Sequence, residues 1–330
     1  MEKRVTIDTI AKDLGISKTT VSRAISGKGR IGKDTVAKVQ AYIAEHNYHP
    51  SAIAKSLAYS RTSNIAFVMN DDKENNDSVF FQKCMWGVQN YAASNGYDVM
   101  LCSVSKDNYE SLERLLRDGK IDGVVIGRVF DEEPAIKLLK KNKIPFVTIG
   151  SMSDETVNQV DNDHAEGCRE FTESLLNKGV RRPALFGGNS SYIMNRNRLS
   201  GYLKALRGHR IDPDQSMIFR NLRSEKSIEE AIASAMERKP DCLICMDDII
   251  CTAVLKILAR KGISVPEDVR VASYYDGPFM RDHYPAVTAL SVDVEELGKT
   301  ACEELIRSIS GNEMTGRRTL GYVICQRESA

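Results

Sequence analysis

The sequence contains no long apolar run, and this absence argues against a helical membrane protein. A transmembrane helix needs about 18 or more consecutive apolar residues, and no stretch approaches that length. The first residues, MEKRVTIDTIAKDLG, lack the apolar core of a secretory signal, because polar residues return at once. We therefore expect a cytoplasmic protein.

Cysteine is present without the spacing of a disulfide framework. The eight cysteines are scattered through apolar stretches, which suits a reducing compartment. Cys242 and Cys245 form a C-x-x-C pair with no second ligand pair nearby, so a buried strand is favoured over zinc or redox chemistry. No metal pattern and no nucleophile–base arrangement stands out. We expect neither an enzyme nor a cofactor.

A glycine motif near the N-terminus resembles the dinucleotide fingerprint only in spacing. Gly27, Gly29 and Gly32 match G-x-G-x-x-G. That motif binds a pyrophosphate when it follows a buried strand and opens a helix. Here it follows a polar helical segment, which argues against a nicotinamide enzyme.

The net charge of +1 conceals an uneven distribution. Residues 1–60 hold ten Lys and Arg against five Asp and Glu, whereas the other 270 residues hold 36 against 40. A basic front of +5 on a mildly acidic body of −4 indicates a polyanionic partner for the front alone.

The first fifty residues have the pattern of a helix-turn-helix. Thr6 is a good N-cap and Gly15 a good C-terminal stop for a first helix, and Ser17 caps a second short helix. A third helix is expected over residues 33–47. Two short helices joined by a tight turn and followed by a supporting helix form this motif.

The outward face of the second helix carries the side chains that could contact DNA. They are Lys18, Thr19, Ser22 and Arg23. Lys and Arg can pair with phosphates or guanine, and threonine methyl groups can contact thymine. The alternative is a small three-helix subdomain with a solvated polar face; the spacing and the local charge favour DNA binding.

The segment YHPSAIAKSLAYSRT, residues 48–62, has helical character over about eight residues only. An isolated helix shorter than about 12 residues is marginal in water. Its Ala and Leu spacing is nevertheless unusual for a linker, which would favour Gly, Ser and Pro. We expect a helix that forms only when a partner buries it.

From Asn64 onward, Val- and Ile-rich runs alternate with amphipathic helical segments. Strands that alternate with helices of 10–15 residues predict parallel sheets covered by helices on both faces. The alternation occurs in two series, the second starting near Val160. We therefore predict two doubly wound α/β lobes with a ligand cleft at the carboxyl ends of their strands.

The whole chain resembles the lac-repressor/gal-repressor family of bacterial transcription regulators. The resemblance is carried by TIDTIAKDLGISKTTVSRAISGK, NYHPSAIAKSLA, VDND, NRNRLSGY, PDCLICMDD, GISVPEDVRVASY and LSVDVEELGKTACEELI. It implies a headpiece over residues 1–49, a hinge over 50–61 and a periplasmic-binding-protein-like core over 62–330. The implied first lobe spans about 62–160 plus 291–320, and the second about 161–290 plus 321–330.

In this family the hinge is a short helix that folds on operator DNA, and Leu57 matches the apolar wedge that enters the minor groove. Ser51 departs from the usual Asn. The resemblance assigns contacts with a pseudo-palindromic operator to residues of the headpiece and the hinge. They are Thr6, Ser17, Lys18, Thr19, Ser22, Arg23, Tyr48, Ser51, Ala54, Lys55 and Leu57.

The family's effector cleft is matched with one departure. Arg198 corresponds to the arginine that binds ligand hydroxyls or a carboxylate. Asp161 and Asp247 fall at strand ends, where relatives place Asp and Asn ligands, but either could instead cap the following helix. Phe80 could stack on a sugar or belong to the core. Tyr275 stands where sugar-binding relatives commonly carry Asp. Its phenol removes a bidentate acceptor, which weakens the case for a neutral hexose and strengthens that for an anionic sugar, a phosphate ester or a protein co-regulator.

The resemblance also implies a homodimer, formed through first-lobe surfaces such as the helix with Val294, Leu297, Ala301 and Leu305 on one face. The chain ends soon after its last strand without a heptad helix, so a tetramer is not expected. The expected function is repression gated by a carbohydrate-related effector. The alternative is a regulator that has lost sugar sensing and answers to a protein or acts constitutively.

Overall fold

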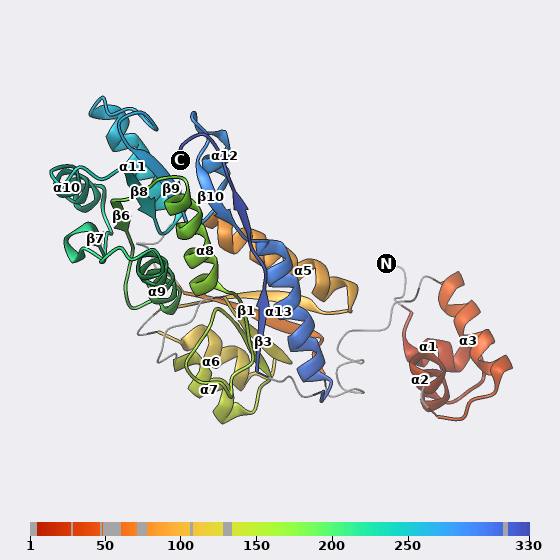
Figure 1. Cartoon of the computed structure of the whole chain (residues 1–330). Helices are drawn as coiled ribbons and strands as arrows, with labels where there is room; N and C mark the ends of the chain where they lie inside the picture. The colour runs from red at the N-terminus through yellow and green to blue at the C-terminus, as the bar shows by residue number, and fades with distance from the viewer. Residues whose placement is uncertain are drawn as a thin grey trace. The chain divides into compact units, whose positions relative to one another are not determined.

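A computed structural model describes residues 5–27, 29–46, 48, 61–70, 78–105, 108–127, 134–312 and 316–330. The chain divides into two compact units, Met1–Thr62 and Ser63–Ala330 (Figure 1). The predicted hinge residues Ser51, Ala54, Lys55 and Leu57 lie outside the described residues.

The first unit is a three-helix domain with a small apolar core. Its helices are α1 (Ile7–Asp13), α2 (Lys18–Ser26) and α3 (Lys33–Glu45). Ile10, Val21 and Val39, one from each helix, are fully buried at its centre. The three helices therefore share one apolar core.

The predicted helix ends of this unit are confirmed. Thr6 and Thr9 form a reciprocal capping box at the start of α1, and the Ser17 side chain accepts a hydrogen bond of 3.1 Å from the Thr20 backbone at the start of α2. Gly15 follows α1 with a positive φ of 64°, which glycine adopts without strain. Such caps contribute about 1 kcal/mol each.

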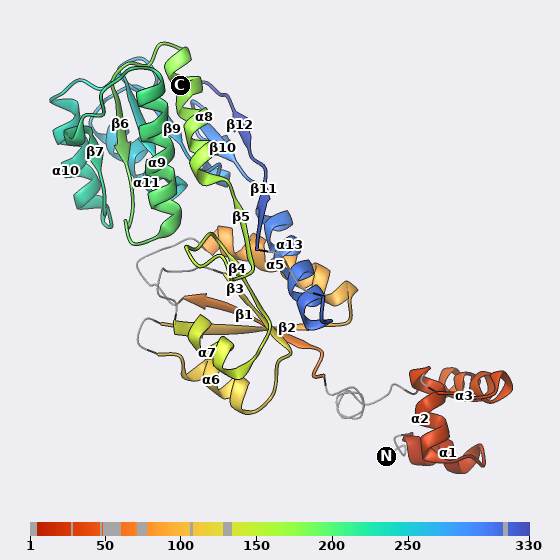
Figure 2. The same cartoon turned by 60° about the horizontal axis from the view of Figure 1, so that its bottom comes forward.

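The second unit contains two six-stranded sheets, each forming one lobe (Figure 2). The first sheet is parallel throughout, in the order β11-β5-β4-β3-β1-β2. Its strands are β1 (Asn64–Asn70), β2 (Asp98–Val104), β3 (Gly123–Ile126), β4 (Phe146–Ile149), β5 (Gln159–Asn162) and β11 (Arg317–Leu320).

Helices cover both faces of this first sheet. On one face pack α5 (Ser78–Ser94) and α13 (Val294–Ile309), and on the other α6 (Glu110–Arg117) and α7 (Pro134–Asn142). The backbones of α5 and α13 nearly touch, because a Cβ on Gly298 would lie 2.0 Å from the Cys84 carbonyl oxygen. Glycine is required at that crossing.

The second sheet has the order β12-β10-β9-β8-β6-β7, and β12 is antiparallel to β10. Its strands are β6 (Pro183–Phe186), β7 (Ile218–Phe219), β8 (Cys242–Cys245), β9 (Arg270–Ser273), β10 (Thr288–Ser291) and β12 (Val323–Cys325). One face is covered by α8 (His164–Asn177) and α9 (Ile193–Gly208), the other by α10 (Glu225–Met236) and α11 (Asp248–Arg260). All four residues of β8 are buried, which confirms the reading of the C-x-x-C run as a strand.

These sheets confirm the predicted pair of doubly wound lobes. Within the described ranges the chain passes between the lobes three times, from β5 to α8, from β10 to α13 and from β11 to β12. The two series did not include the strands β10, β11 and β12, the 3-10 turn η1 (Gln215–Met217) or the helix α12 (Pro278–Asp282). The helix α12 begins with Pro278 after Gly277, an ordinary start signal that a five-residue helix is too short to support by periodicity.

Candidate functional site

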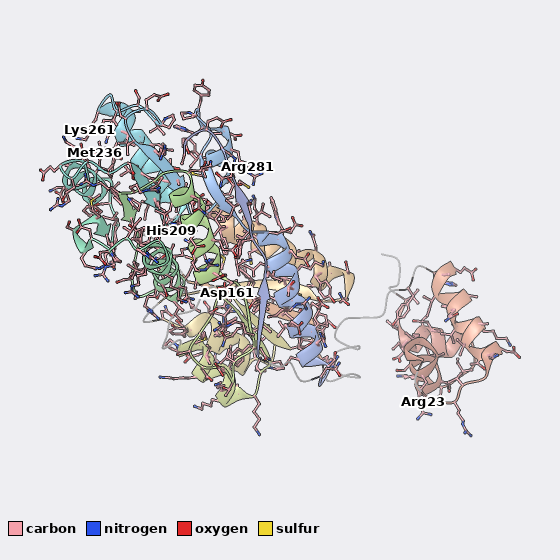
Figure 3. All side chains as sticks on the ribbon, in the orientation of Figure 1. Arg23, Asp161, His209, Met236, Lys261 and Arg281 are labelled. Carbon is pink, nitrogen blue, oxygen red and sulfur yellow. The ribbon has the colours of Figure 1, made fainter. Side chains whose placement is uncertain are left out.

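The exposed face of α2 carries the predicted DNA-contacting side chains of the headpiece. Lys18, Thr19 and Arg23 are exposed and Ser22 is half-buried. Figure 3 shows Arg23 extending outward from its unit. The face is polar because the apolar residues of α2 turn to the core, with Val21 fully buried.

Lys18 is held by a weak surface pair. Its Nζ atom lies 2.7 Å from an Asp8 carboxylate oxygen, and both side chains are more than 60% exposed, at 68% and 64%. Such exposed pairs contribute about 0–1 kcal/mol. Lys18 can therefore exchange Asp8 for another anion at little cost.

Tyr48 has a different environment from the other headpiece residues. Its side chain belongs to the core of the first unit and is 9% exposed, and burial raises the pKa of its phenol. The ring is thus engaged in packing α3 against the rest of the unit. Thr6 and Ser17 are exposed, and their hydroxyl oxygens accept the capping hydrogen bonds.

A cavity of about 200 Å³ lies between the two lobes of the second unit. The first lobe contributes residues that include Phe80 and Asp161, and the second residues that include Arg198, Asp247 and Tyr275. All five effector-site residues that the resemblance assigns therefore line one cavity. A cavity of about 150 Å³ accommodates benzene, so this one has room for a small organic ligand.

Asp161, at the end of β5, is fully occupied by its own lobe's polar groups and by His164. One carboxylate oxygen accepts hydrogen bonds from the Ser151 backbone at 2.9 Å and hydroxyl at 2.6 Å. The other accepts one from the Asn162 backbone at 2.8 Å and lies 3.2 Å from His164 Nε2. A carboxylate offers about four acceptor positions, and four donors surround this one.

Burial alone raises the pKa of Asp161, but the charge and hydrogen bond of His164 and the bonds from Ser151 outweigh it and hold the pKa below its usual value. Asp161 therefore stays ionised and organises this wall of the cavity. His164, the first residue of α8, also lines the cavity and is 10% exposed. The sequence alone does not reveal its pairing with Asp161.

Arg198 enters the cavity from α9 with its guanidinium buried. It donates to the Met246 carbonyl, the residue as a whole is 4% exposed, and no hydrogen-bond partner for its Nε atom lies among the described residues. Asn195, one turn earlier, is 6% exposed and also lines the cavity. Its Oδ1 atom likewise lacks a partner in the part of the chain that the structure describes.

Asp247 occupies the position between β8 and α11. Its Oδ1 atom accepts a hydrogen bond of 2.8 Å from the Ile250 backbone, so it is the N-cap of α11. It lines the cavity as well. The two interpretations that the sequence leaves open, helix cap and cavity residue, are both realised.

Phe80 and Tyr275 meet across the cavity. Their ring centroids are 6.0 Å apart at an interplanar angle of 69°, an edge-to-face arrangement. Tyr275 belongs to the second lobe by sequence but packs into the apolar cluster of the first lobe and is 8% exposed. The Tyr275 side chain therefore packs against the first lobe and links the two lobes by this contact.

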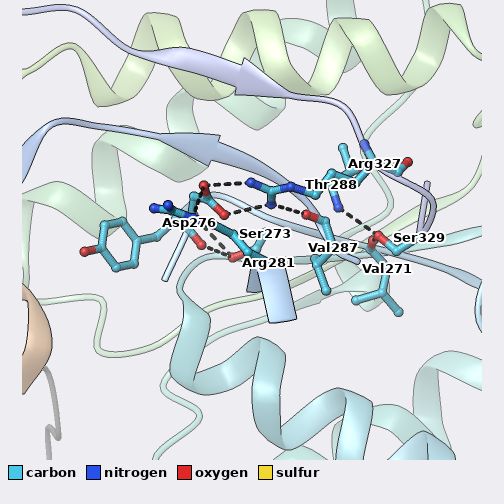
Figure 4. A network of polar contacts seen from close by, with 9 residues as sticks. Val271, Ser273, Asp276, Arg281, Val287, Thr288, Arg327 and Ser329 are labelled. Atoms are coloured by element: carbon cyan, nitrogen blue, oxygen red, sulfur yellow. Dashed lines mark hydrogen bonds and ion pairs between the residues drawn. The ribbon is translucent and has the colours of Figure 1, made fainter. Parts of the chain in front are cut away.

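Asp276, the next residue, is committed to a buried ion pair (Figure 4). Its two oxygens accept hydrogen bonds of 2.7 and 2.8 Å from the two terminal nitrogens of Arg327, and Arg281 Nε lies 3.3 Å away. This pair fixes the C-terminal segment after β12, and the Asp276 carboxylate is not among the groups lining the cavity.

The apolar face of α13 has a different role from the one expected. Val294, Leu297, Ala301 and Leu305 are each at most 4% exposed, because they pack inside the first lobe. The close approach of α5 and α13 explains this burial. The expectation that this face forms a dimer interface is therefore wrong.

Comparison with known proteins agrees with the two units. A model of bacterial regulatory proteins of the lacI family matches residues 6–51, and a model of the periplasmic binding protein-like domain matches residues 172–330. The HTH-type transcriptional regulator MalR of Streptococcus pneumoniae serotype 4 is 26% identical over 326 residues, covering 94% of each chain.

Two solved structures share the fold along the chain. The complex of the transcriptional regulator CelR with cellobiose has a TM-score of 0.74 at 26% identity and covers 99% of this chain and 100% of that one. The lac repressor dimer bound to operator and the anti-inducer ONPF has a TM-score of 0.81 at 23% identity, over 99% of both chains.

A helix-turn-helix unit joined in one chain to a two-lobed unit with an internal cavity defines a DNA-binding transcription regulator. The chain combines a helix-turn-helix domain of the lacI family with a periplasmic-binding-protein-like domain, and its relatives are lacI-family regulators. Among the described residues, every helix is too short or too polar to traverse a lipid bilayer.

Proposed function

We propose that this protein is a homodimeric repressor whose affinity for a pseudo-palindromic operator is set by a carbohydrate-related effector in the cavity between the lobes. In this proposal residues 1–49 bind DNA, residues 50–61 couple the units, and residues 62–330 bind the effector and dimerise. The observation that carries effector binding is the buried Arg198, whose Nε–H has no partner in the described part of the chain.

A buried donor without a partner costs about 1–3 kcal/mol, and such a cost is commonly offset by a bound ligand. The cellobiose complex of CelR, a relative with the same two-lobed fold, supports a sugar as the class of effector. An effector that binds one arrangement of the lobes better than another shifts the population of that arrangement. By the same linkage, operator binding changes the affinity for the effector by the factor by which the effector changes the affinity for the operator.

The dimer needs a surface other than the buried face of α13. The strand β2 lies at the edge of its sheet, where Leu101 is 61% exposed, and Trp86 on the neighbouring helix α5 is 49% exposed. Exposed apolar side chains beside the free edge of an edge strand favour association with another chain. We propose that this surface contributes to dimerisation.

The DNA-binding half is tested by selecting bound sequences from a random DNA pool with the full chain. We expect an inverted repeat. Arg23→Ala should lower affinity by about 1–3 kcal/mol and relax one base position, whereas Lys18→Ala should weaken all sequences alike and reduce the salt slope by about one.

Lys226→Ala is the matched control, because Lys226 is 87% exposed on the second unit. It should leave affinity unchanged. Selection of no common sequence, or equal effects of Lys18→Ala and Lys226→Ala, would contradict the proposed headpiece role.

The coupling role of residues 50–61 is tested by Gly substitutions at Ala52 and Ala54, which lie outside the described residues. Each Gly should cost a helical hinge about 1 kcal/mol, so operator affinity should fall. Unchanged affinity and unchanged effector response would refute the hinge proposal.

A further inference from the structure

The α9 wall of the cavity presents two buried polar atoms without partners among the described residues. They are the Nε–H donor of Arg198 and the Oδ1 acceptor of Asn195. The two residues are three positions apart on α9, so their side chains emerge on the same face of the helix. Both residues are more than nine-tenths buried, being 4% and 6% exposed.

The orientation of the Asn195 amide follows from its other contact. Nδ2 lies 2.9 Å from the Asn189 carbonyl oxygen, which can only accept a hydrogen bond. The amide nitrogen must therefore face Asn189, and Oδ1 is left as the atom without a partner. This acceptor requires a ligand group that carries a hydrogen on oxygen or nitrogen.

The surroundings disfavour an anion at this wall. A Cβ on Gly188 would lie 3.5 Å from Asn195 Nδ2 and 3.7 Å from Asp247 Oδ2, so the Asn195 amide and the Asp247 carboxylate both border the space beside Gly188. A phosphate or carboxylate group could accept from Arg198 but could give nothing to Asn195 Oδ1, and it would be repelled by Asp247. A hydroxyl group both donates and accepts.

We infer that the cavity selects a neutral, hydroxyl-bearing ligand, and that Asn195 is the residue that enforces this choice. Neighbouring hydroxyls of the ligand accept from Arg198 Nε–H and donate to Asn195 Oδ1, so that one ligand satisfies both atoms. Sugar acids and sugar phosphates are excluded when their charged group falls at α9. This inference rests on the proposed function, since it requires that the cavity bind the effector.

The test measures binding of the full chain to three groups of probes by thermal shift and calorimetry. The first group is D-glucose, D-galactose and cellobiose; the second is D-gluconate, D-glucuronate and D-glucose 6-phosphate; the third is adenine and hypoxanthine. We expect a member of the first group to bind and the second group to bind at least tenfold more weakly.

Asn195→Leu should weaken the neutral sugar about 10- to 100-fold, as loss of one or two hydrogen bonds to a buried site implies. Asn197→Leu is the matched control, because Asn197 lies on the same helix but does not line the cavity. It should bind like the unmodified chain.

Monodeoxy analogues of the bound sugar separate a ligand contact from a merely structural role. For the unmodified chain, the analogue that lacks the hydroxyl facing α9 should bind at least about tenfold more weakly than the parent sugar. For Asn195→Leu, the same analogue should bind less than about threefold more weakly than the parent sugar. Equal losses in both proteins would overturn the role of Asn195.

The inference fails if the charged sugars bind as well as the neutral ones, or if Asn195→Leu binds normally. Binding of adenine or hypoxanthine without any sugar would overturn the inference while leaving effector binding in place. Failure of every probe would overturn both the inference and effector gating, whereas operator selection would still report on DNA binding.

Discussion

The ion pair of Asp276 and Arg327 allows a test of whether Asp276 stabilises the fold and does not bind the ligand. Asp276→Asn replaces one of the two oxygens that accept from Arg327 at 2.7 and 2.8 Å with an amide group that can only donate. It also removes the charge opposite a guanidinium that is largely buried, with a side-chain exposure of 17%.

The expected cost is large because Arg327 remains charged. Its hydrogen bond with Asp276 raises the pKa of the guanidinium further above its usual range. Removing one partner of a buried pair costs about 3–5 kcal/mol. For a chain of this size about 1 kcal/mol shifts the melting temperature by about 2 °C, so we expect a decrease of roughly 6–10 °C.

Calorimetric unfolding of the full chain measures this effect, and Arg281 supplies the control. Arg281 contacts the same carboxylate at 3.3 Å, but its side chain is 54% exposed. Arg281→Gln should therefore cost no more than about 1 kcal/mol. In the double variant Asp276→Asn with Arg327→Gln, the loss should be smaller than the sum of the single losses.

A melt of Asp276→Asn within about 1 °C of the unmodified chain would refute this reasoning. If the same variant lost sugar binding while keeping its stability, Asp276 would be a ligand residue and its pairing with Arg327 would be incidental.

Three further predictions concern the cavity and the dimer. Because folding lowers the pKa of Asp161, its ionised carboxylate stabilises the folded chain above about pH 4, and this stabilisation is lost as the pH falls through the lower folded pKa. Asp161→Asn should therefore flatten the acid side of the curve of unfolding free energy against pH. An unchanged curve would contradict the pairing with His164. In urea unfolding, Tyr275→Ala should lower the free energy of unfolding by about 3 kcal/mol, whereas Tyr275→Phe should lower it by less than about 1 kcal/mol. The reason is that the edge-to-face contact with Phe80 depends on the ring, which Phe keeps. Similar losses for Ala and Phe would count against this contact. Leu101→Glu should give a monomer in light scattering and Lys226→Glu a dimer; persistence of the dimer in Leu101→Glu would exclude the β2 edge.

Most residues of the candidate site could be predicted from the sequence, because they belong to recognisable motifs. The hydrogen bonds and ion pairs that these residues form could not be predicted in this way. The sequence identified Arg198, Asp161, Asp247 and Tyr275, and the fold brings them to one cavity. It missed Asn195 and His164, since an Asn or a His near a helix start has no distinguishing pattern. Their importance depends on which neighbours are absent or present in space.

The sequence by itself determined the local structure of this protein. The caps at Thr6 and Ser17, the apolar faces of α1 to α3 and the alternation of buried strands with amphipathic helices depend on residues a few positions apart. Interactions of this range survive any rearrangement of the rest of the chain, so propensity and periodicity suffice to predict them.

Only the tertiary structure decided how the polar groups near the cavity are used. Asp276 pairs with Arg327, 51 positions away, and is thereby withdrawn from ligand binding. Ser151 and His164 occupy the acceptor positions of Asp161, and α5 covers the apolar face of α13. The Nε atom of Arg198 and the Oδ1 atom of Asn195 have no partner among the described residues. Each outcome depends on strand order and helix crossing, because a buried polar group is satisfied or left open by whatever the fold places beside it.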